Sequence, residues 1–300
     1  MRETELIALI RRLNAGRAPG LVAGIGDDCA VLRPRPGEDL LVTTDFLLEG
    51  VHFLRQTHAA ADCGWKTLAR GLSDIAAMGG TPRYAFVSLA LAPWAGGAWV
   101  RGFYRGLNTL ARRHGVVVAG GDLTGAEKIV CDIIVLGAVK RGRALRRGGA
   151  SPGDRLYVTG LLGGSALGLE TRQGRAWKRH LRPEPRIEAG LALASRLAAT
   201  ACMDLSDGLA LDLFRLCTES GCAAELHGGL PIFPGATLAQ ALSGGEDYEL
   251  LFAAPPSRRM PASIAAVPVT EIGRCVQGTP GRILFAGKPL PARGWDPFRD

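Results

Sequence analysis

The alternation of apolar runs with amphipathic segments between Leu40 and Val139 constrains the fold of this 300-residue chain more than any other feature. The hydrophobic period changes repeatedly between that of a strand and that of a helix. We expect strands at 40–44, 84–91, 116–119 and 129–139, and helices at about 63–78 and 99–114. This order predicts an α/β or α+β domain.

A second series of elements begins after RRGGASPGD at 146–154, a segment that concentrates glycine, proline and serine. DRLYVTG is typical of a strand, GGSALGLE opens a helix, another helix is expected near 187–199, and MDLSDGLALDLFRLC predicts a strand end followed by a helix. Short strands are expected at 248–253, 270–273 and 283–285. We therefore predict two domains, an N-terminal domain of residues 1–145 and a C-terminal domain of residues 146–300.

The composition, 47% hydrophobic and 21% charged, is that of a globular protein with a sizeable core. The net charge of +8 favours anionic partners. The densest basic segment, KRGRALRR at 140–147, has no interleaved aromatic residues, so we expect no nucleic-acid partner.

The seven cysteines form no C-x-x-C pair, which predicts a reduced, cytoplasmic protein. The N-terminus, MRETELIALIRRLN, has the pattern of an amphipathic helix and lacks that of a signal peptide. The most apolar region, 84–100, is interrupted by Pro93 and by glycines, so no membrane segment is expected.

Acidic residues recur beside glycine or at expected strand ends. They lie in GIGDDCAV (Asp27, Asp28), TTDFLLEG (Asp45), LSDIAAMGG (Asp74), GGDLTG (Asp122), MDLSDG (Asp204, Asp207) and GGEDYELL (Glu246, Asp247). Taken singly, each is typical of a turn or a helix cap. Asp45, at the end of an apolar strand, and Asp74, within an apolar helical pattern, would be costly without a partner. Together they indicate a cation site, although a cap or solvent could also satisfy Asp45.

Oxygen ligands without clustered histidine or cysteine select hard cations, and phosphate chemistry favours magnesium over calcium. Several carboxylates indicate more than one Mg²⁺ ion, with ATP as the inferred co-substrate. Neither a G-x-x-x-x-G-K-[ST] motif nor a protein-kinase motif occurs in the sequence. GLLGGSALG at 160–168 could be a phosphate loop, but a tight turn is the favoured interpretation.

Seven segments, taken in order, resemble the thiamine-monophosphate kinase family of the aminoimidazole-ribotide-synthetase-like superfamily. They are GIGDDCAV, TTDFLLEGVHF, KTLARGLSDIAAMGGTP, GGDLTG, LRPEPR, MDLSDGLALDL and SGGEDYELLF. The resemblance implies a two-domain fold, in which the N-terminal sheet domain forms a homodimer and binds ATP with Mg²⁺, while the C-terminal α/β domain completes the site. The implied reaction is ATP plus thiamine monophosphate giving ADP plus thiamine diphosphate.

The resemblance also implies roles for individual residues. Magnesium ligands would be Asp28, Thr43, Thr44, Asp45, Asp74, Asp122, Asp204 and Asp207. Nucleotide contacts would be Tyr104, Gly121, Asp122, Arg147 and Ser206. Substrate contacts would be His52, Glu246 and Trp295. Two departures from the family pattern, Gly71 for asparagine and Leu123 for threonine, affect positions beside these ligands.

Two alternative functions and the role of Trp295 stay open. Another ATP-dependent synthetase of the same superfamily, of the aminoimidazole ribotide or selenophosphate type, is the nearest alternative; the latter type calls for a reactive N-terminal cysteine, and none precedes Cys29. A polyanion-binding protein is an alternative from a different class. Trp295 would either pack the chain end or present its ring to the substrate.

We assign no general base, because a phosphate monoester is largely dianionic near neutral pH.

Overall fold

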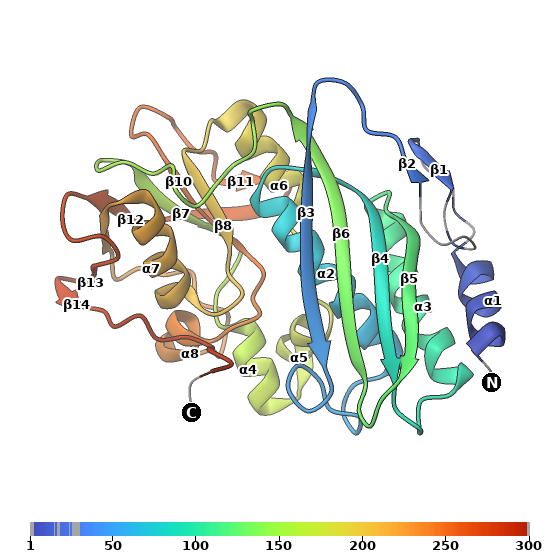
Figure 1. The fold of residues 1–300 in the computed structure, drawn as a ribbon. Coiled ribbons are helices and arrows are strands. Elements are labelled where there is room, and N and C mark those ends of the chain that lie inside the picture. Colours follow the sequence, from blue (N-terminus) through green and yellow to red (C-terminus); the bar gives the residue numbers. More distant parts are fainter. Residues whose placement is uncertain (1–2, 15, 17–18, 24, 26–30, 299–300) are drawn as a thin grey trace. The chain divides into compact units, whose positions relative to one another are not determined.

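The computed structural model describes residues 3–14, 16, 19–23, 25 and 31–298. These residues divide into two compact units (Figure 1). Unit 1 comprises the described residues within 1–75 and 81–142, and unit 2 comprises those within 76–80 and 143–300. The mixture of helices and sheets confirms the predicted α/β class.

Unit 1 is built on a four-stranded sheet in the order β3-β6-β4-β5. Its strands are β3 (Glu38–Leu48), β4 (Thr81–Leu91), β5 (Val117–Gly125) and β6 (Val130–Lys140). Only β4 and β5 are parallel, and the connection between them is helix α3 (Gly97–Arg113). The remaining elements are α1 (Glu3–Leu13), the β1 (Leu21–Ala23) and β2 (Val31–Leu32) pair, and α2 (Ala60–Ala77).

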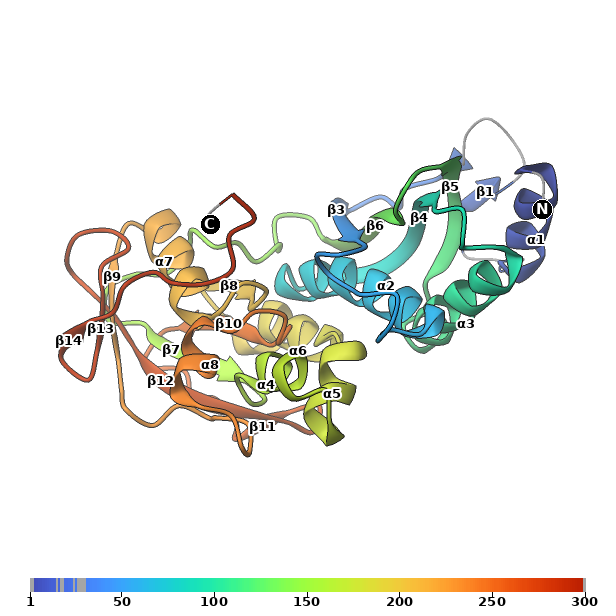
Figure 2. The same cartoon turned by 90° about the horizontal axis from the view of Figure 1, so that it is seen from below.

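Helices α2 and α3 cover one face of this sheet (Figure 2). On the opposite face, Leu21 and Leu32 of the β1–β2 pair pack with Tyr84 and Phe86 of β4. The same face of β3 stays open, because Leu40, Val42 and Phe46 are 51%, 62% and 53% exposed. Unit 1 therefore has an exposed apolar strip along β3.

Unit 2 is built on an eight-stranded sheet, whose main path is β14-β13-β9-β12-β7-β10-β8 with β11 paired to β12. Its strands are β7 (Arg155–Thr159), β8 (Ala201–Asp204), β9 (Ala223–Leu226), β10 (Leu250–Ala254), β11 (Ser263–Ile264), β12 (Val267–Val276), β13 (Ile283–Phe285) and β14 (Lys288–Pro289). Its helices are α4 (Gly164–Thr171), α5 (Gly174–Leu181), α6 (Ile187–Ala192), which continues into the π-turn η1 (Leu193–Leu197), α7 (Leu209–Ser220) and α8 (Leu238–Ser243). Leu213 and Leu216 of α7 join Leu156 and Leu251 of the sheet in one buried core.

Several predicted strand ends were wrong. The strand predicted at 270–273 extends over Val267–Val276 as β12, and β4 begins three residues before the predicted position 84. Strand β3 continues through Asp45 to Leu48, and β5 continues beyond Ala119 to Gly125. A strand can carry polar residues when neighbouring elements supply their hydrogen bonds, as described below for β3. The sequence analysis did not predict α5, a helix of 8 residues in which only Ala176 and His180 are buried. Among the described residues, every helix is too short or too polar to span a bilayer.

Candidate active site

Asp45 projects from β3 toward the helix-covered face of unit 1. Arg70 of α2 donates a hydrogen bond from Nη2 to Asp45 Oδ1 at 2.9 Å, and the two side chains are 14% and 24% exposed. This ion pair compensates the carboxylate within the chain itself. The sequence analysis did not identify Arg70 as a site residue. Arg70 lies one helical turn before Asp74 and therefore on the same side of α2.

Thr43 and Asp74 form the second polar contact on this face. Thr43 lies two residues before Asp45 in β3, so both side chains point toward α2. Its hydroxyl donates a hydrogen bond to Asp74 Oδ2. The structure thus brings three of the predicted magnesium ligands to neighbouring positions on β3 and α2.

Gly71 lies between these contacts on α2, at one of the two departures from the family pattern. A Cβ atom built at Gly71 would lie 2.5 Å from Val135 Cγ2 of β6. A larger residue would require either the Val135 side chain or α2 to shift. Glycine at this position therefore accompanies a close helix–sheet contact beside the Asp45–Arg70 pair.

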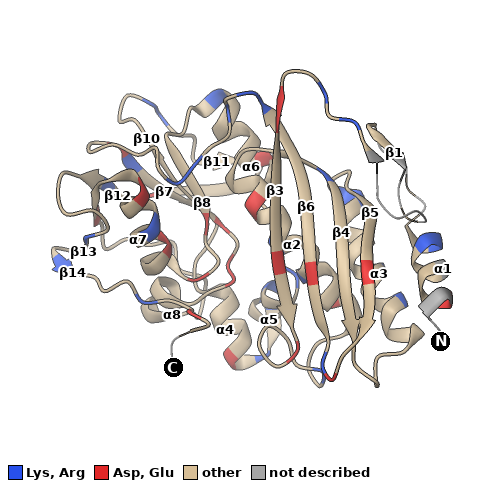
Figure 3. Ribbon diagram, in the orientation of Figure 1, with Lys and Arg blue, Asp and Glu red and all other residues tan. Residues whose placement is uncertain are grey.

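The other predicted ligands of the sheet, Thr44 and Asp122, lie on its opposite face. Phe46, Asp132, Ser88 and Asp122 stand in one cross-strand row, and Thr44 Oγ1 donates to Asp132 Oδ1 at 2.7 Å. Figure 3 shows acidic positions at similar height on β3, β6 and β5. Within unit 1, the sheet separates Thr44 and Asp122 from the ligands that face α2. Asp132 was missed, although it interrupts an apolar strand as Asp45 does.

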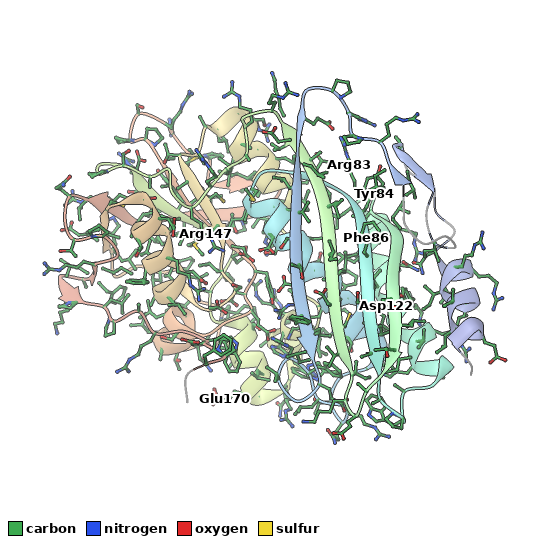
Figure 4. The ribbon with its side chains drawn as sticks, viewed as in Figure 1. Arg83, Tyr84, Phe86, Asp122, Arg147 and Glu170 are labelled. Atoms are coloured by element: carbon green, nitrogen blue, oxygen red, sulfur yellow. The ribbon has the colours of Figure 1, made fainter. Side chains whose placement is uncertain are left out.

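Gly121 precedes Asp122, which is labelled in Figure 4. The φ of Gly121 is +151°, and a Cβ atom added to Gly121 would lie 2.0 Å from Val87 O of β4. Only glycine fits this close approach between strands. Packing against β4 therefore requires glycine at position 121, whether or not Gly121 also contacts a nucleotide as predicted.

His52 lies half-buried after β3. The backbone N–H of Leu48 donates to its Nδ1 at 3.0 Å, and Lys66 Nζ donates to its carbonyl oxygen at 3.4 Å. Because Nδ1 accepts a hydrogen bond, a neutral ring carries its proton on Nε2. The turn after β3 thus sets both the tautomer and the direction of this predicted substrate contact.

Tyr104 is only 2% exposed, and burial raises the pKa of its hydroxyl. Its side chain lines a cavity of about 450 Å³ together with Arg101, Arg105 and Arg112 of α3. The remaining lining residues are Leu13, Ala98 and Asn108. The structure therefore places Tyr104 at a basic cavity whose lining includes no other predicted site residue.

In unit 2, the last residue of β8 and the loop after it carry three predicted site residues. Asp204 is 4% exposed, and Asp207 Oδ2 accepts a hydrogen bond from Arg215 Nη1 at 2.5 Å. Ser206 contributes its carbonyl oxygen, which accepts the N–H of Glu246 at 2.7 Å. This bond links the β8 loop to the segment that carries the predicted substrate contact.

Glu246 adopts φ +64° and Tyr248 adopts φ +50°, conformations that are uncommon outside glycine. The N–H of Tyr248 donates to Leu205 O at 2.9 Å. Such strain persists only where the surroundings over-determine the backbone, and it concentrates at functional sites. The segment that carries Glu246 is therefore held in place by the β8 loop.

Asp247 has a structural role. Its carboxylate accepts the N–H of Gly163 at 2.5 Å and that of Ser165 at 3.1 Å, at the start of α4. Burial raises its pKa to about 6, although these bonds and Arg179 act in the opposite direction. The helix start in GLLGGSALG thus holds a protein carboxylate, so the structure favours a turn over a phosphate loop.

Glu249 is fully buried and forms the centre of an ion cluster. Arg186 donates to its two oxygens at 2.7 and 2.5 Å, Arg179 donates at 2.6 Å, and Thr159 Oγ1 donates at 2.7 Å. Burial by itself would raise the carboxyl pKa, but Arg186 and Arg179 outweigh it and hold the pKa below its usual range. Arg186 is the last residue of the LRPEPR motif, which had no assigned role.

The last two predicted residues are exposed. Arg147 lies in the segment before β7 (Figure 4), and its carbonyl oxygen accepts a hydrogen bond from Ser220 Oγ at 2.7 Å. Trp295 is 49% exposed, and its backbone N–H donates to Asp207 O at 2.9 Å. The backbone of the chain end is thus attached near the β8 loop while half of the Trp295 surface stays open.

The predicted metal ligands can be tested for their fit to Mg²⁺. Thr43, Asp45 and Asp74 offer oxygen donors only, which suits a hard cation. The described residues contain no group of three histidine, cysteine or acidic residues placed to hold a metal. Asp28 lies outside the described residues. The donor type of Thr43, Asp45 and Asp74 is the one that Mg²⁺ prefers, and the described part of unit 1 supplies two carboxylates and one hydroxyl on this face.

Comparison with known protein families identifies the class of protein to which this chain belongs. The family model described as AIR synthase related protein, N-terminal domain, matches residues 26–139, and the C-terminal domain model matches 151–284. The chain is thus an AIR synthase related protein with both domains of that family.

Similar proteins narrow this assignment. The thiamine-monophosphate kinase of Escherichia coli (strain K12) is 39% identical over 302 residues, covering 92% of this chain and 91% of that protein. Thiamine-monophosphate kinase from Stenotrophomonas maltophilia K279a matches with a TM-score of 0.85 and 36% identity, covering 97% of this chain and 98% of that one. AaThiL complexed with AMPPCP and TMP matches with a TM-score of 0.79 and 32% identity, covering 99% of both chains. The chain belongs to the thiamine-monophosphate kinase family.

Proposed function

We propose that this protein transfers the γ-phosphoryl group of ATP to the phosphate of thiamine monophosphate, giving ADP and thiamine diphosphate. The observation that carries this proposal is the 39% identity, over nearly the whole length, to a thiamine-monophosphate kinase. The similar AaThiL chain was solved with AMPPCP and TMP, which supports ATP and thiamine monophosphate as the two substrates.

In unit 1, one magnesium ion would be held by Thr43, Asp45 and Asp74, with Asp28 as a further ligand. Thr44 and Asp122 lie on the opposite face of the sheet and would belong to a second magnesium site. When bound, magnesium neutralises phosphate charge. Asp45 is partly exposed and is compensated by a single arginine. Arg70 can therefore leave the carboxylate when a cation of higher charge binds.

In unit 2, Asp204 and Asp207 would be metal ligands, and Ser206 and Arg147 would contact the nucleotide. In unit 1, the proposed nucleotide contacts are Tyr104 and Gly121. Glu246, Trp295 and His52 would contact thiamine monophosphate. The exposed guanidinium of Arg147 can donate to phosphate oxygens. The half-exposed ring of Trp295 can lie against the cationic thiazolium.

The chemistry requires positioning and charge neutralisation more than proton transfer. Phosphoryl transfer passes through a loose transition state with charge on the equatorial oxygens, which Arg147 can stabilise. The accepting phosphate has a second pKa of about 6 and is already largely dianionic near neutral pH. The mechanism therefore needs no general base.

We also propose that the protein is a cytoplasmic homodimer. The apolar strip of Leu40, Val42 and Phe46 on β3 supports a second copy covering this face. The six described cysteines are free and buried, which agrees with a reducing compartment. Sedimentation of the active protein tests the dimer, and an active monomer would contradict it.

The test of function is an assay of the purified protein with ATP and Mg²⁺ against thiamine, thiamine monophosphate and aminoimidazole precursors. We expect ADP and thiamine diphosphate from thiamine monophosphate alone. Turnover of an aminoimidazole precursor would instead support a synthetase of the same superfamily. Salt-dependent binding of nucleic acid without ATP turnover would support the polyanion-binding alternative.

A further inference from the structure

His180 is a buried histidine at the end of α5, beside the predicted substrate contact of unit 2. It is 2% exposed, and its ring stacks on Trp177 with centroids 5.2 Å apart and planes 10° apart. Its Nδ1 lies 2.9 Å from Ser165 Oγ and 3.4 Å from Glu246 Oε2. One ring nitrogen thus faces both the start of α4 and the Glu246 carboxylate.

The position of the proton on His180 follows from its neighbours. An ionised carboxylate only accepts hydrogen bonds, so an attractive contact with Glu246 places a hydrogen on Nδ1. The Ser165 hydroxyl can accept the same hydrogen. The N–H of Ser165 is fixed in turn by Asp247, to which it donates at 3.1 Å. The helix start and the stacked Trp177 therefore hold the imidazole in one orientation.

The backbone of Glu246 is fixed separately. It is held at φ +64° by the bond from its own N–H to Ser206 O at 2.7 Å. The direction of the carboxylate then depends on side-chain rotation, which costs entropy to restrict. His180 is the described histidine that contacts this carboxylate, and it approaches from the protein interior.

We propose that His180 is a positioning residue, which holds the Glu246 carboxylate in the orientation that binds thiamine monophosphate. This inference rests on the proposed function and on the substrate contact of Glu246. Thiamine monophosphate offers a cationic ring and an amino group, both of which a carboxylate can engage. His180 itself is buried and acts through Glu246.

The test compares steady-state kinetics of His180→Phe and His180→Asn with the unsubstituted protein. Phenylalanine keeps the stack on Trp177 but removes the Nδ1 hydrogen, whereas asparagine places an N–H donor near the same point. We expect His180→Phe to raise KM for thiamine monophosphate about 10-fold, the factor typical of one hydrogen bond to a charged group. KM for ATP should stay unchanged, and His180→Asn should recover most of the loss. Ser165→Ala, which removes one hydroxyl, gives a milder second probe if the phenylalanine variant does not fold.

A double-mutant cycle separates positioning from general stability. In a Glu246→Gln background, adding His180→Phe should raise KM for thiamine monophosphate no further, because His180 acts only through that carboxylate. Independent effects that multiply, or a loss of thermal stability with unchanged KM, would overturn the proposal. If Glu246→Gln alone leaves this KM unchanged in an active kinase, the carboxylate is not a substrate contact and the inference fails. If the unsubstituted protein does not phosphorylate thiamine monophosphate, the proposed function itself fails.

Discussion

The two units use arginine–carboxylate contacts in different ways. In unit 1, Asp45 is 24% exposed and accepts one hydrogen bond from Arg70. In unit 2, Glu249 is fully buried and accepts bonds from Arg179, Arg186 and Thr159. The first carboxylate has surface open to a ligand, and the second has its oxygens surrounded by donors from its own chain.

This difference separates ligand-binding acids from structural acids. A buried carboxylate that is saturated by charged donors cannot accept a metal without first leaving two partly buried arginines without their counter-charge. A partly exposed pair contributes little to stability, so its partner can be exchanged at low cost. Four predictions test the distinction, beginning with the largest expected effect.

Replacing the fully buried Glu249 by glutamine should destabilise the protein by about 3–5 kcal/mol, because two partly buried arginines lose their counter-charge. Denaturant unfolding measures this change. Glu271→Gln, at an exposed ion pair with Arg155, is the matched control and should change stability far less. Equal effects of the two substitutions would remove the structural role assigned to Glu249.

Replacing Asp45 by asparagine should lower kcat/KM about 100- to 1000-fold, the range for loss of one electrostatic group in an active site. The shape is nearly preserved, so thermal unfolding should change little. Asp39→Asn, on the same strand with its carboxylate bonded to the N–H of Gly142, is the control and should retain activity. Near-normal turnover of the Asp45 variant at limiting magnesium would exclude Asp45 as a metal ligand.

The contrast between a buried structural group and a partly exposed ligand-binding group also applies to two tryptophans. Trp65 is 2% exposed with the Arg113 guanidinium 4.6 Å from its ring centroid, whereas Trp295 is 49% exposed. Trp295→Ala should raise KM for thiamine monophosphate about 3- to 30-fold, from the energy range of cation–π contacts. KM for ATP should change little, and Trp295→Phe should recover most of the loss. An unchanged KM for thiamine monophosphate, or equal weakening of ATP binding and thermal stability, would make Trp295 a packing residue.

The smallest expected effect concerns Arg70 itself. Arg70→Met removes a positive charge from Asp45, so magnesium should bind about 5-fold more tightly, the factor that corresponds to ~1 kcal/mol for a partly exposed pair. Calorimetric titration with magnesium in the absence of nucleotide measures the change. Arg83→Met, which breaks the 2.6 Å contact with Glu38, is the control. Weaker magnesium binding by the Arg70 variant would show that the arginine supports the metal site.

The sequence also located most of the elements, with limited accuracy at their ends. The strand at 283–285 and the helix near 99–114 correspond to β13 and α3, because apolar periodicity reflects burial directly. The ends of β3 and β5 were placed too early, since a polar residue in a strand looks like a terminus until its partner is known. Thr44 has such a partner in Asp132, 88 residues away in the sequence.

For the candidate site, the sequence by itself determined which acids stand in unfavourable surroundings, the oxygen-only donor chemistry and the family. Only the tertiary structure decided what each acid contacts. GGEDYELL contains three acids within four residues, yet Glu246 meets His180, Asp247 caps α4 and Glu249 binds Arg179 and Arg186. The physical reason is that compensation of a charge depends on distance in space, and these partners lie 63 to 84 positions away along the chain.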